Sequence, residues 1–98
     1  MSYTIVDIHT RPSVDVAFFN NWSDIQSYVT TTYIETGKLL STDIGFGADQ
    51  TVRTITRTFV DQAAFDQFHT DPVITASISS IAEYNQTNSI THVLILPL

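Results

Sequence analysis

The segment over residues 58–76 constrains the fold most strongly, because it ends one strand and begins two helices. An alternating stretch ends at Phe59, and Asp61 follows in the position of a helix N-cap. Asp71 repeats this capping chemistry, and Pro72 occupies a first helical position, where its missing N–H costs no hydrogen bond. The sequence therefore predicts a strand-to-helix junction, with a helix that breaks and restarts at this proline.

Hydrophobic periodicity divides the rest of the chain into further strands and helices. Alternation predicts strands at Tyr3–Thr10, Lys38–Phe46, Gln50–Val60 and Ile90–Leu96, and helical spacing predicts helices over residues 24–35 and from Asp61 to about Asn85. The order strand, helix, strand, strand, helix, strand is a split βαβ repeat. We expect one α+β domain over residues 1–98, with a ferredoxin-like βαββαβ fold: a four-stranded antiparallel sheet carrying both helices on one face.

Composition narrows the classes of partner. Ten acidic residues against four basic ones give a formal charge of −6, which repels phosphate backbones and anionic membrane surfaces. We therefore expect neither a nucleic-acid nor a membrane partner. The chain has no cysteine, and no apolar run is long enough for a signal or a membrane span. These features are typical of a cytoplasmic protein.

One face of the predicted sheet is left without helices. Because helices need apolar partners, we expect Val6, Ile8, Val52, Val60, Val93 and Ile95 to face them. The open face then carries Asp7, His9, Arg53, Ile55, Arg57, Phe59, His92 and Leu94. Such a mixed face is too apolar to remain in water, which indicates a partner.

The segment from Phe59 to Val73 resembles the antibiotic-biosynthesis-monooxygenase-like (ABM-like) domains of the dimeric α+β barrel superfamily. In these domains the third strand ends in an aromatic residue, followed by an acidic cap, an alanine, a histidine and a Ser-Pro-like turn. The corresponding positions here are Phe59, Asp61, Ala64, Phe68 and Asp71-Pro72. The resemblance implies a homodimer in which two open sheet faces meet, with a pocket in each subunit between sheet and helices. It places Ile55, Phe59, Leu94 and Leu96 in the dimer interface.

The same resemblance implies no cofactor and transfers no catalytic residue intact. Members that oxidise polycyclic phenols without a cofactor, and haem-degrading members, use a tryptophan and the helix histidine. Here Phe59 takes the tryptophan position and Phe68 the histidine position. His69 is displaced by one residue, about 100° around the helix. Trp22 lies on the first helix and does not obviously replace either.

The histidines leave several roles open. His69 is either a pocket acid or base, since its ordinary pKa lies near neutrality, or a polar residue at a helix end. His9 and His92 belong to strands that neighbour each other in the expected sheet. They flank a ligand, form a two-histidine metal site, or make interface hydrogen bonds. No third ligand has a recognisable spacing, so we predict no metal site.

The arginines and aromatic residues also allow two interpretations each. Arg53 and Arg57 share one strand face and either clamp a carboxylate or pair with Asp7 or Asp43. The aromatic set either lines a pocket for a planar ligand or forms plain core. Its members are Phe18, Phe19, Trp22, Phe65, Phe68 and Tyr84.

Two functional hypotheses follow, and the sequence does not decide whether the protein is an enzyme. The first is a homodimeric domain that binds a small apolar or aromatic molecule between the second helix and the sheet. Its candidate lining is Trp22, Phe65, Phe68, His69, Arg53, Arg57 and His92. If it is an ABM-like cofactor-independent oxygenase, the candidate catalytic residues are His69, His9 and Arg57. The second is a non-catalytic module that dimerises through its open sheet face.

Overall fold

The computed structural model describes residues 1–19 and 22–96, with the side chains of residues 22–24 left out. Its elements are the strands β1 (Tyr3–Thr10), β2 (Leu39–Phe46), β3 (Val52–Phe59) and β4 (Thr91–Ile95), the α-helices α1 (Trp22–Val29), α2 (Gln62–Thr70) and α3 (Pro72–Thr87), and the π-helical turn η1 (Thr30–Ile34). The strands form a four-stranded antiparallel sheet in the order β2-β3-β1-β4. The predicted ferredoxin-like topology is therefore confirmed.

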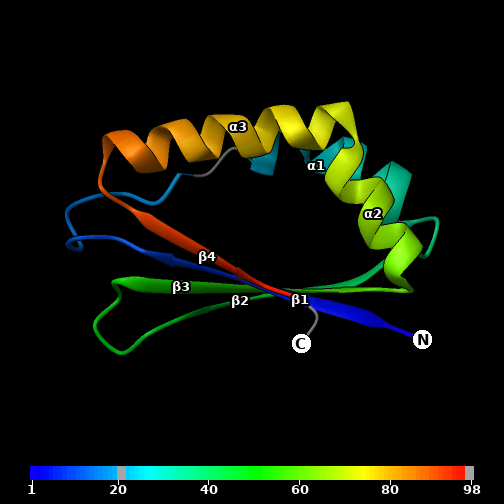
Figure 1. The fold of residues 1–98 in the computed structure, drawn as a ribbon, viewed down its shortest axis with the longest axis horizontal. Helices are drawn as coiled ribbons and strands as arrows, with labels where there is room; N and C mark the ends of the chain where they lie inside the picture. The colour runs from blue at the N-terminus through cyan, green and yellow to red at the C-terminus, as the bar shows by residue number, and fades with distance from the viewer. Residues whose placement is uncertain (20–21, 97–98) are drawn as a thin grey trace.

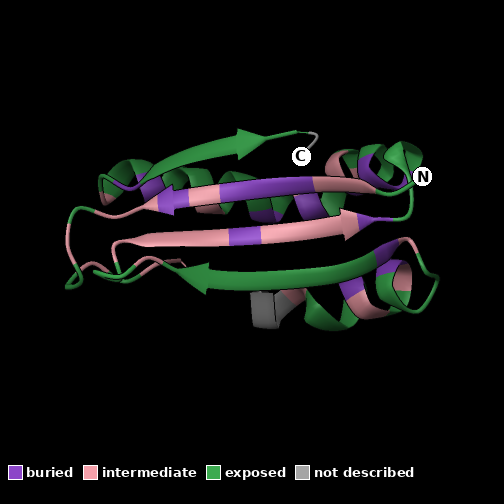
Figure 2. Cartoon of the chain, turned by 90° about the horizontal axis from the view of Figure 1, so that it is seen from below, coloured by how far each residue is buried: buried purple, intermediate pink, exposed green. Residues whose placement is uncertain are grey.

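The molecule has two layers, with every helix on the same face of the sheet (Figure 1). α1 and α2 lie toward one end of the sheet, and α3 runs along its length. The opposite face of the sheet carries none of the described helices (Figure 2). Within the described residues, no helix is both long and apolar enough to span a bilayer.

Two aspartate caps set the beginnings of α2 and α3, as the sequence predicts. Asp61 has an extended backbone and accepts a hydrogen bond from the Ala64 amide at 2.8 Å. The Asp71 Oδ1 accepts one from the Val73 amide at 2.9 Å, and Pro72 is the first residue of α3. Each cap satisfies an amide that the first helical turn leaves without a partner.

Asp71 also connects α1 and η1 to the junction between α2 and α3. Its Oδ2 accepts hydrogen bonds from the Tyr28 hydroxyl at 2.5 Å and the Tyr33 hydroxyl at 2.6 Å. Burial raises the pKa of Tyr33, and the bond to the Asp71 carboxylate raises it further. This carboxylate therefore fixes α1 and η1 against the α2–α3 break.

The first helix ends differently from the regular helix predicted over residues 24–35. After Val29 the chain winds as η1, whose first residues are three consecutive threonines that lose side-chain freedom in an α-helix. Gly37 has a φ of +75°, and its amide bonds the Ile34 carbonyl at 3.1 Å. The predicted glycine C-cap is therefore present.

The hydrophobic core lies under α1, η1 and α2, at one end of the sheet. It comprises Ile5, Val29, Tyr33, Leu39, Phe59, Ala64, Phe65, Phe68 and Ile74. Phe59 is fully buried, with ring centroids 5.6 Å from Phe65 and 5.3 Å from Phe68. The end of β3 therefore contributes its aromatic side chain to the core beneath α2.

The predicted assignment of the two sheet faces is wrong. Because side chains alternate along a strand, Arg53, Ile55 and Arg57 lie on the helix-covered face together with Phe59. Ile55 and Phe59 are 8% and 0% exposed, so the subunit itself buries two of the residues expected at the dimer interface. Leu94 and Leu96 are 39% and 43% exposed, and Leu94 lies on the same covered side.

The open face instead carries β-branched side chains. They are Thr4, Val6, Ile8 and Thr10 of β1, Thr54, Thr56 and Thr58 of β3, and Val93 and Ile95 of β4. Val6, Ile8, Val93 and Ile95 were expected to face the helices. Thr4 and Thr58 hydrogen-bond across this face at 3.2 Å between their Oγ1 atoms. The prediction failed because the charged residues do not need an open face: they lie above the sheet around a cavity.

Candidate functional site

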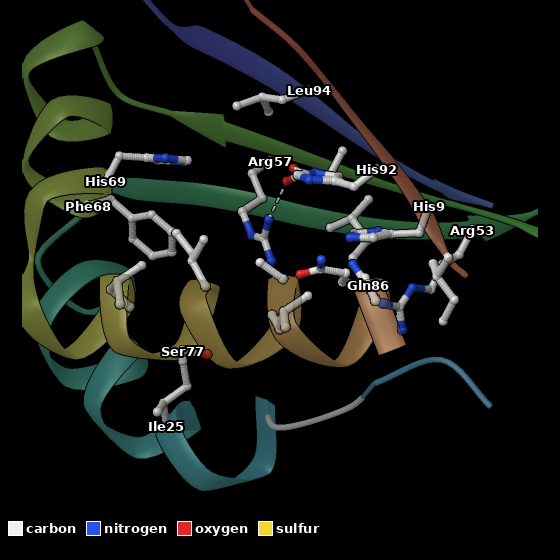
Figure 3. Close-up of a pocket in the computed structure, with 18 residues that line it drawn as sticks. His9, Ile25, Arg53, Arg57, Phe68, His69, Ser77, Gln86, His92 and Leu94 are labelled. Carbon is white, nitrogen blue, oxygen red and sulfur yellow. Dashed lines mark hydrogen bonds and ion pairs between the residues drawn. The ribbon is translucent and has the colours of Figure 1, made fainter. Parts of the chain in front are cut away.

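A cavity of about 420 Å³ lies between the sheet and α3 (Figure 3). The strands contribute Asp7, His9, Arg53, Ile55, Arg57, His92 and Leu94. α3 contributes Ile74, Ser77, Ile78, Ile81, Ala82, Asn85 and Gln86, while Ile25, Phe68, His69 and Ile90 complete the lining. Its volume lies within the range of small-molecule sites.

The two central strands explain why the cavity forms there. Along β1 the helix-facing residues change from Ile5 in the core to Asp7 and His9 in the cavity. Along β3 they change from Phe59 to Arg57 and Arg53 in the same direction. Charged side chains do not close against an apolar helix without losing hydration, so this half of the face stays open beneath α3. The cavity therefore combines a polar floor with a mostly apolar roof.

Asp7 is the central group of this floor. Its Oδ2 lies 2.9 Å from Arg57 Nη1, and its Oδ1 lies 2.7 Å from His92 Nε2. Burial by itself raises the pKa of Asp7, but the His92 hydrogen bond and the Arg57 charge outweigh it and hold the pKa below its usual value. The carboxylate is thus ionised at neutral pH. The interpretation of Asp7 as an arginine partner is confirmed for Arg57.

His9 is a neutral histidine in the floor. It is only 5% exposed, and its ring stacks on that of His92, with centroids 4.5 Å apart and planes at 8°. Burial lowers the pKa of His9 to about 4, aided by the positive charges at His92 and Arg53. Its Nδ1 atom is buried and has no hydrogen-bond partner among the described residues.

Arg53 lies directly opposite His9 in the β1–β3 register. Its guanidinium carbon lies 4.6 Å from the centroid of the Phe18 ring, and its Nη2 reaches the Phe19 carbonyl only at 3.5 Å. Burial lowers its pKa, and the charges of Arg57 and Arg11 lower it further. In the described part of the chain, no carboxylate forms an ion pair with Arg53, and its Nε has no hydrogen-bond partner.

His69 and Phe68 both line the cavity although they are consecutive residues of α2. Phe68 also belongs to the core, whereas the His69 ring packs 4.3 Å from the ring of Phe65. Burial lowers the pKa of His69, and the Arg57 charge acts in the same direction. Phe65 lies in the core behind these two residues and does not line the cavity. The side chain of Trp22 falls outside the described residues.

The arrangement of His9 and His92 is relevant to the two-histidine metal site that the sequence left open. One nitrogen of His92 is already bonded to Asp7, and the rings face each other as parallel plates. Among the described residues, no three histidine, cysteine or acidic side chains come together in a way that could hold a metal ion.

Sequence reasoning placed the pocket against the second predicted helix but named none of the α3 residues that line the cavity. Ile74, Ser77, Ile78 and Ile81 fit a helical stripe that indicates packing, and the stripe continues to Asn85. The available signal was the small polar Ser77 in the middle of that stripe, together with an amide at its end. A helix face that only packs against the sheet would carry large apolar side chains at both positions.

The buried neutral His9 predicts a loss of stability on mild acidification. The pKa of His9 is lower in the folded chain than the ordinary 6.5, so the unfolded chain binds more protons between the two values. Stability should fall as pH drops from about 6.5 toward 4, by roughly 1–3 kcal/mol. Asp7 acts only at lower pH, because a carboxyl whose pKa is lowered on folding loses its contribution as pH falls from the ordinary 3.8 toward the lowered value.

Urea unfolding measured at several values between about pH 7.5 and pH 4.5 checks this expectation. His9→Phe is the matched variant, because it retains an aromatic ring beside His92 but cannot titrate. Its stability should depend less on pH, with a remaining slope in the same direction from His69. An equal slope in both proteins would contradict the role given to His9.

Comparisons with known proteins place this geometry in a wider context. No protein-family model and no curated protein matches the sequence. Several solved structures match in fold. SnoaB from Streptomyces nogalater, described as a cofactor-independent oxygenase, has a TM-score of 0.61 at 11% identity, covering 96% of this chain and 90% of SnoaB. The chain has the ABM-like fold.

Two further structures agree with this assignment. A protein from Deinococcus radiodurans, described as a candidate antibiotic biosynthesis monooxygenase, has a TM-score of 0.57 at 12% identity, covering 97% of this chain and 90% of that one. A dimeric ferredoxin-like protein from an uncultured marine organism has a TM-score of 0.55 at 12% identity, covering 99% and 95%. The resemblance noted between Phe59 and Val73 is therefore confirmed at the level of fold.

Proposed function

We propose that the protein is a homodimer whose subunits each bind a small, mostly apolar molecule in the cavity beneath α3. The observation that supports this is a volume of about 420 Å³ with a fixed polar floor: Asp7, Arg57 and His92 hold one another in place. A preformed apolar site with a few oriented polar groups is the usual arrangement for small-molecule binding. Of the predicted lining residues, Arg53, Arg57, Phe68, His69 and His92 surround this volume.

The homodimer in this proposal forms through the open sheet face. Val93 and Ile95 are 55% and 41% exposed there, beside Val6 and Ile8 on β1. The face is rich in β-branched residues, and Asp43 of β2, opposite Thr56, is its charged member among the described strands. A nearly uncharged sheet surface of valine, isoleucine and threonine side chains favours burial against a second copy. The dimeric ferredoxin-like protein similar to this chain supports the same association.

Oxygenation without a cofactor is the second candidate function, and the likeness to SnoaB favours it. Such a reaction needs a base that takes a proton from the substrate and charge that stabilises the resulting anion. His69 and His9 have lowered pKa values, so both are neutral proton acceptors at neutral pH. Arg57 supplies positive charge between them in the cavity (Figure 3). Oxygen consumption with a polycyclic phenol tests this candidate, and His69→Ala should reduce it.

Native mass spectrometry tests binding and association in one spectrum. We expect protein purified gently from its expression host to appear as a dimer carrying extra mass from a retained small molecule. Ile81→Trp is the control, because Ile81 lines the cavity roof and a larger side chain there fills the site without touching the open face. This variant should remain dimeric and lose the extra mass.

The remaining outcomes separate the two hypotheses. A dimer without extra mass, which also fails to bind any added apolar molecule, would favour the non-catalytic module that only dimerises. A monomer at micromolar concentration would contradict the proposed association. Extra mass retained equally by Ile81→Trp would place the ligand outside this cavity.

A further inference from the structure

We infer that the cavity is built for an amphiphilic monocarboxylate, whose carboxylate binds between Arg53 and His9 while its apolar body lies beneath α3. The inference rests on the proposed function and names the class of its ligand. It is carried by the distribution of charge across the cavity floor and by two buried polar atoms at one end of it, His9 Nδ1 and Arg53 Nε, which have no hydrogen-bond partner among the described residues.

The charge balance of the floor leaves one positive group uncompensated. Asp7 uses one carboxylate oxygen for Arg57 and the other for His92, so its negative charge is committed to these neighbours. Among the described residues, no other acidic side chain lines the cavity. Arg53 therefore lines the site without a carboxylate partner among the described residues. A half-buried guanidinium in this state favours a ligand that brings one negative charge.

His9 supplies a second polar contact at the same place. It pairs directly with Arg53 across β1 and β3, and both side chains lie at the same end of the cavity (Figure 3). Its Nδ1 is buried without a partner among the described residues. As a neutral imidazole, His9 can carry its hydrogen on Nδ1 and donate it to an oxygen atom. One carboxylate can then satisfy the guanidinium with one oxygen and the imidazole with the other.

The remaining lining selects the body of the ligand. The roof from α3 is apolar at Ile74, Ile78 and Ile81, and Phe68 closes the other end. The polar members of the roof are Ser77, Asn85 and Gln86, so a sugar with hydroxyls along its whole length would leave those beside the three isoleucines without partners. A ligand with two or more negative charges would exceed the single uncompensated cation. An aromatic or aliphatic body with one terminal carboxylate fits both limits.

Calorimetric titration with matched acid and amide pairs tests the inference. The probes are naphthoate against naphthamide and decanoate against decanamide, which differ in charge but hardly in shape. We expect at least one acid to bind roughly tenfold or more tightly than its amide. Arg53→Met should weaken the acid by roughly 10- to 100-fold and leave the amide unchanged, in keeping with the strength of hydrogen bonds to charged groups.

Arg11→Met is the matched control. Arg11 lies against the same Phe18 ring, 4.5 Å from its centroid, but does not line the cavity. The substitution therefore removes one positive charge, one contact to Phe18 and the hydrogen bonds to the Gln50 and Val16 carbonyls, without removing the proposed anion contact. The acid should keep its preference over the amide in this variant.

Each other result counts against a specific step. Equal binding of acid and amide would overturn the carboxylate inference while leaving the proposed binding function intact. A preference that survives Arg53→Met would overturn the assignment of Arg53. If neither acid nor amide binds to the unaltered protein, the proposed function fails and this inference fails with it.

Discussion

Asp7→Asn is expected to lower the free energy of unfolding by about 3–5 kcal/mol, the usual effect of removing one partner from a buried ion pair. Asparagine has nearly the same size, so the change removes charge rather than volume. Arg57, with a side chain only 14% exposed, would lose the carboxylate at 2.9 Å that balances it. His92 would lose the charge of its partner at 2.7 Å. Urea unfolding near neutral pH measures the loss.

Two controls separate this effect from a general loss of negative charge. Asp15→Asn changes an exposed carboxylate in the connection after β1, away from the open face, and should alter stability by less than about 0.5 kcal/mol. The double variant Asp7→Asn with Arg57→Met should recover part of the loss, because it removes the charge that the single variant leaves buried. A loss in Asp7→Asn no larger than in Asp15→Asn would show that the pair contributes little.

The elements of this fold could be predicted because their signals are local. The caps at Asp61 and Asp71 act on amides only two or three residues away. Gly37 ends the first helical segment through its own backbone conformation. Alternation and turn residues located all four strands, and the order of elements then left few topologies to consider. The winding of η1 was beyond this reasoning, since no residue pattern specified a π-helix.

The orientation of the sheet could not be predicted, because both faces of β3 offered an argument. One face carries three threonines and the other carries Arg53, Ile55, Arg57 and Phe59. The rule that helices need apolar partners chose the face that carries Val52 and Val60 together with these threonines. It failed because the charged residues are distributed unevenly: Phe59 packs in the core and the arginines face a cavity. The large aromatic residue was the more reliable sign, since hydroxyl-bearing threonines make a poor core.

The candidate site was predicted in its residue types more than in its arrangement. Arg53, Arg57, His69 and His92 were singled out, and all four line one cavity. The different roles of Arg53 and Arg57 depend on which of the two contacts Asp7. Both arginines lie on β3, next to β1. That choice is decided by side-chain geometry in three dimensions, which strand periodicity does not encode.

The face assignment yields the second large effect, a contrast between two aspartate substitutions. Phe59→Asp should unfold the chain, because it removes a fully buried ring and places an unpaired charge in the core. The expected loss exceeds about 4 kcal/mol, which is comparable to the whole stability of many small domains. Far-UV circular dichroism and urea unfolding measure it.

Val93→Asp should leave the subunit folded but weaken the homodimer. Val93 is 55% exposed on the open face, so the subunit can hydrate a carboxylate there and keep its fold. A homodimer formed through this face would bury one new charge from each subunit, and association should weaken by several kcal/mol. Light scattering after size-exclusion chromatography at micromolar concentration would then give a folded monomer. A folded Phe59→Asp variant together with an intact Val93→Asp dimer would contradict the orientation of the sheet, because the charge tolerated by each face would then be the reverse of the burial observed.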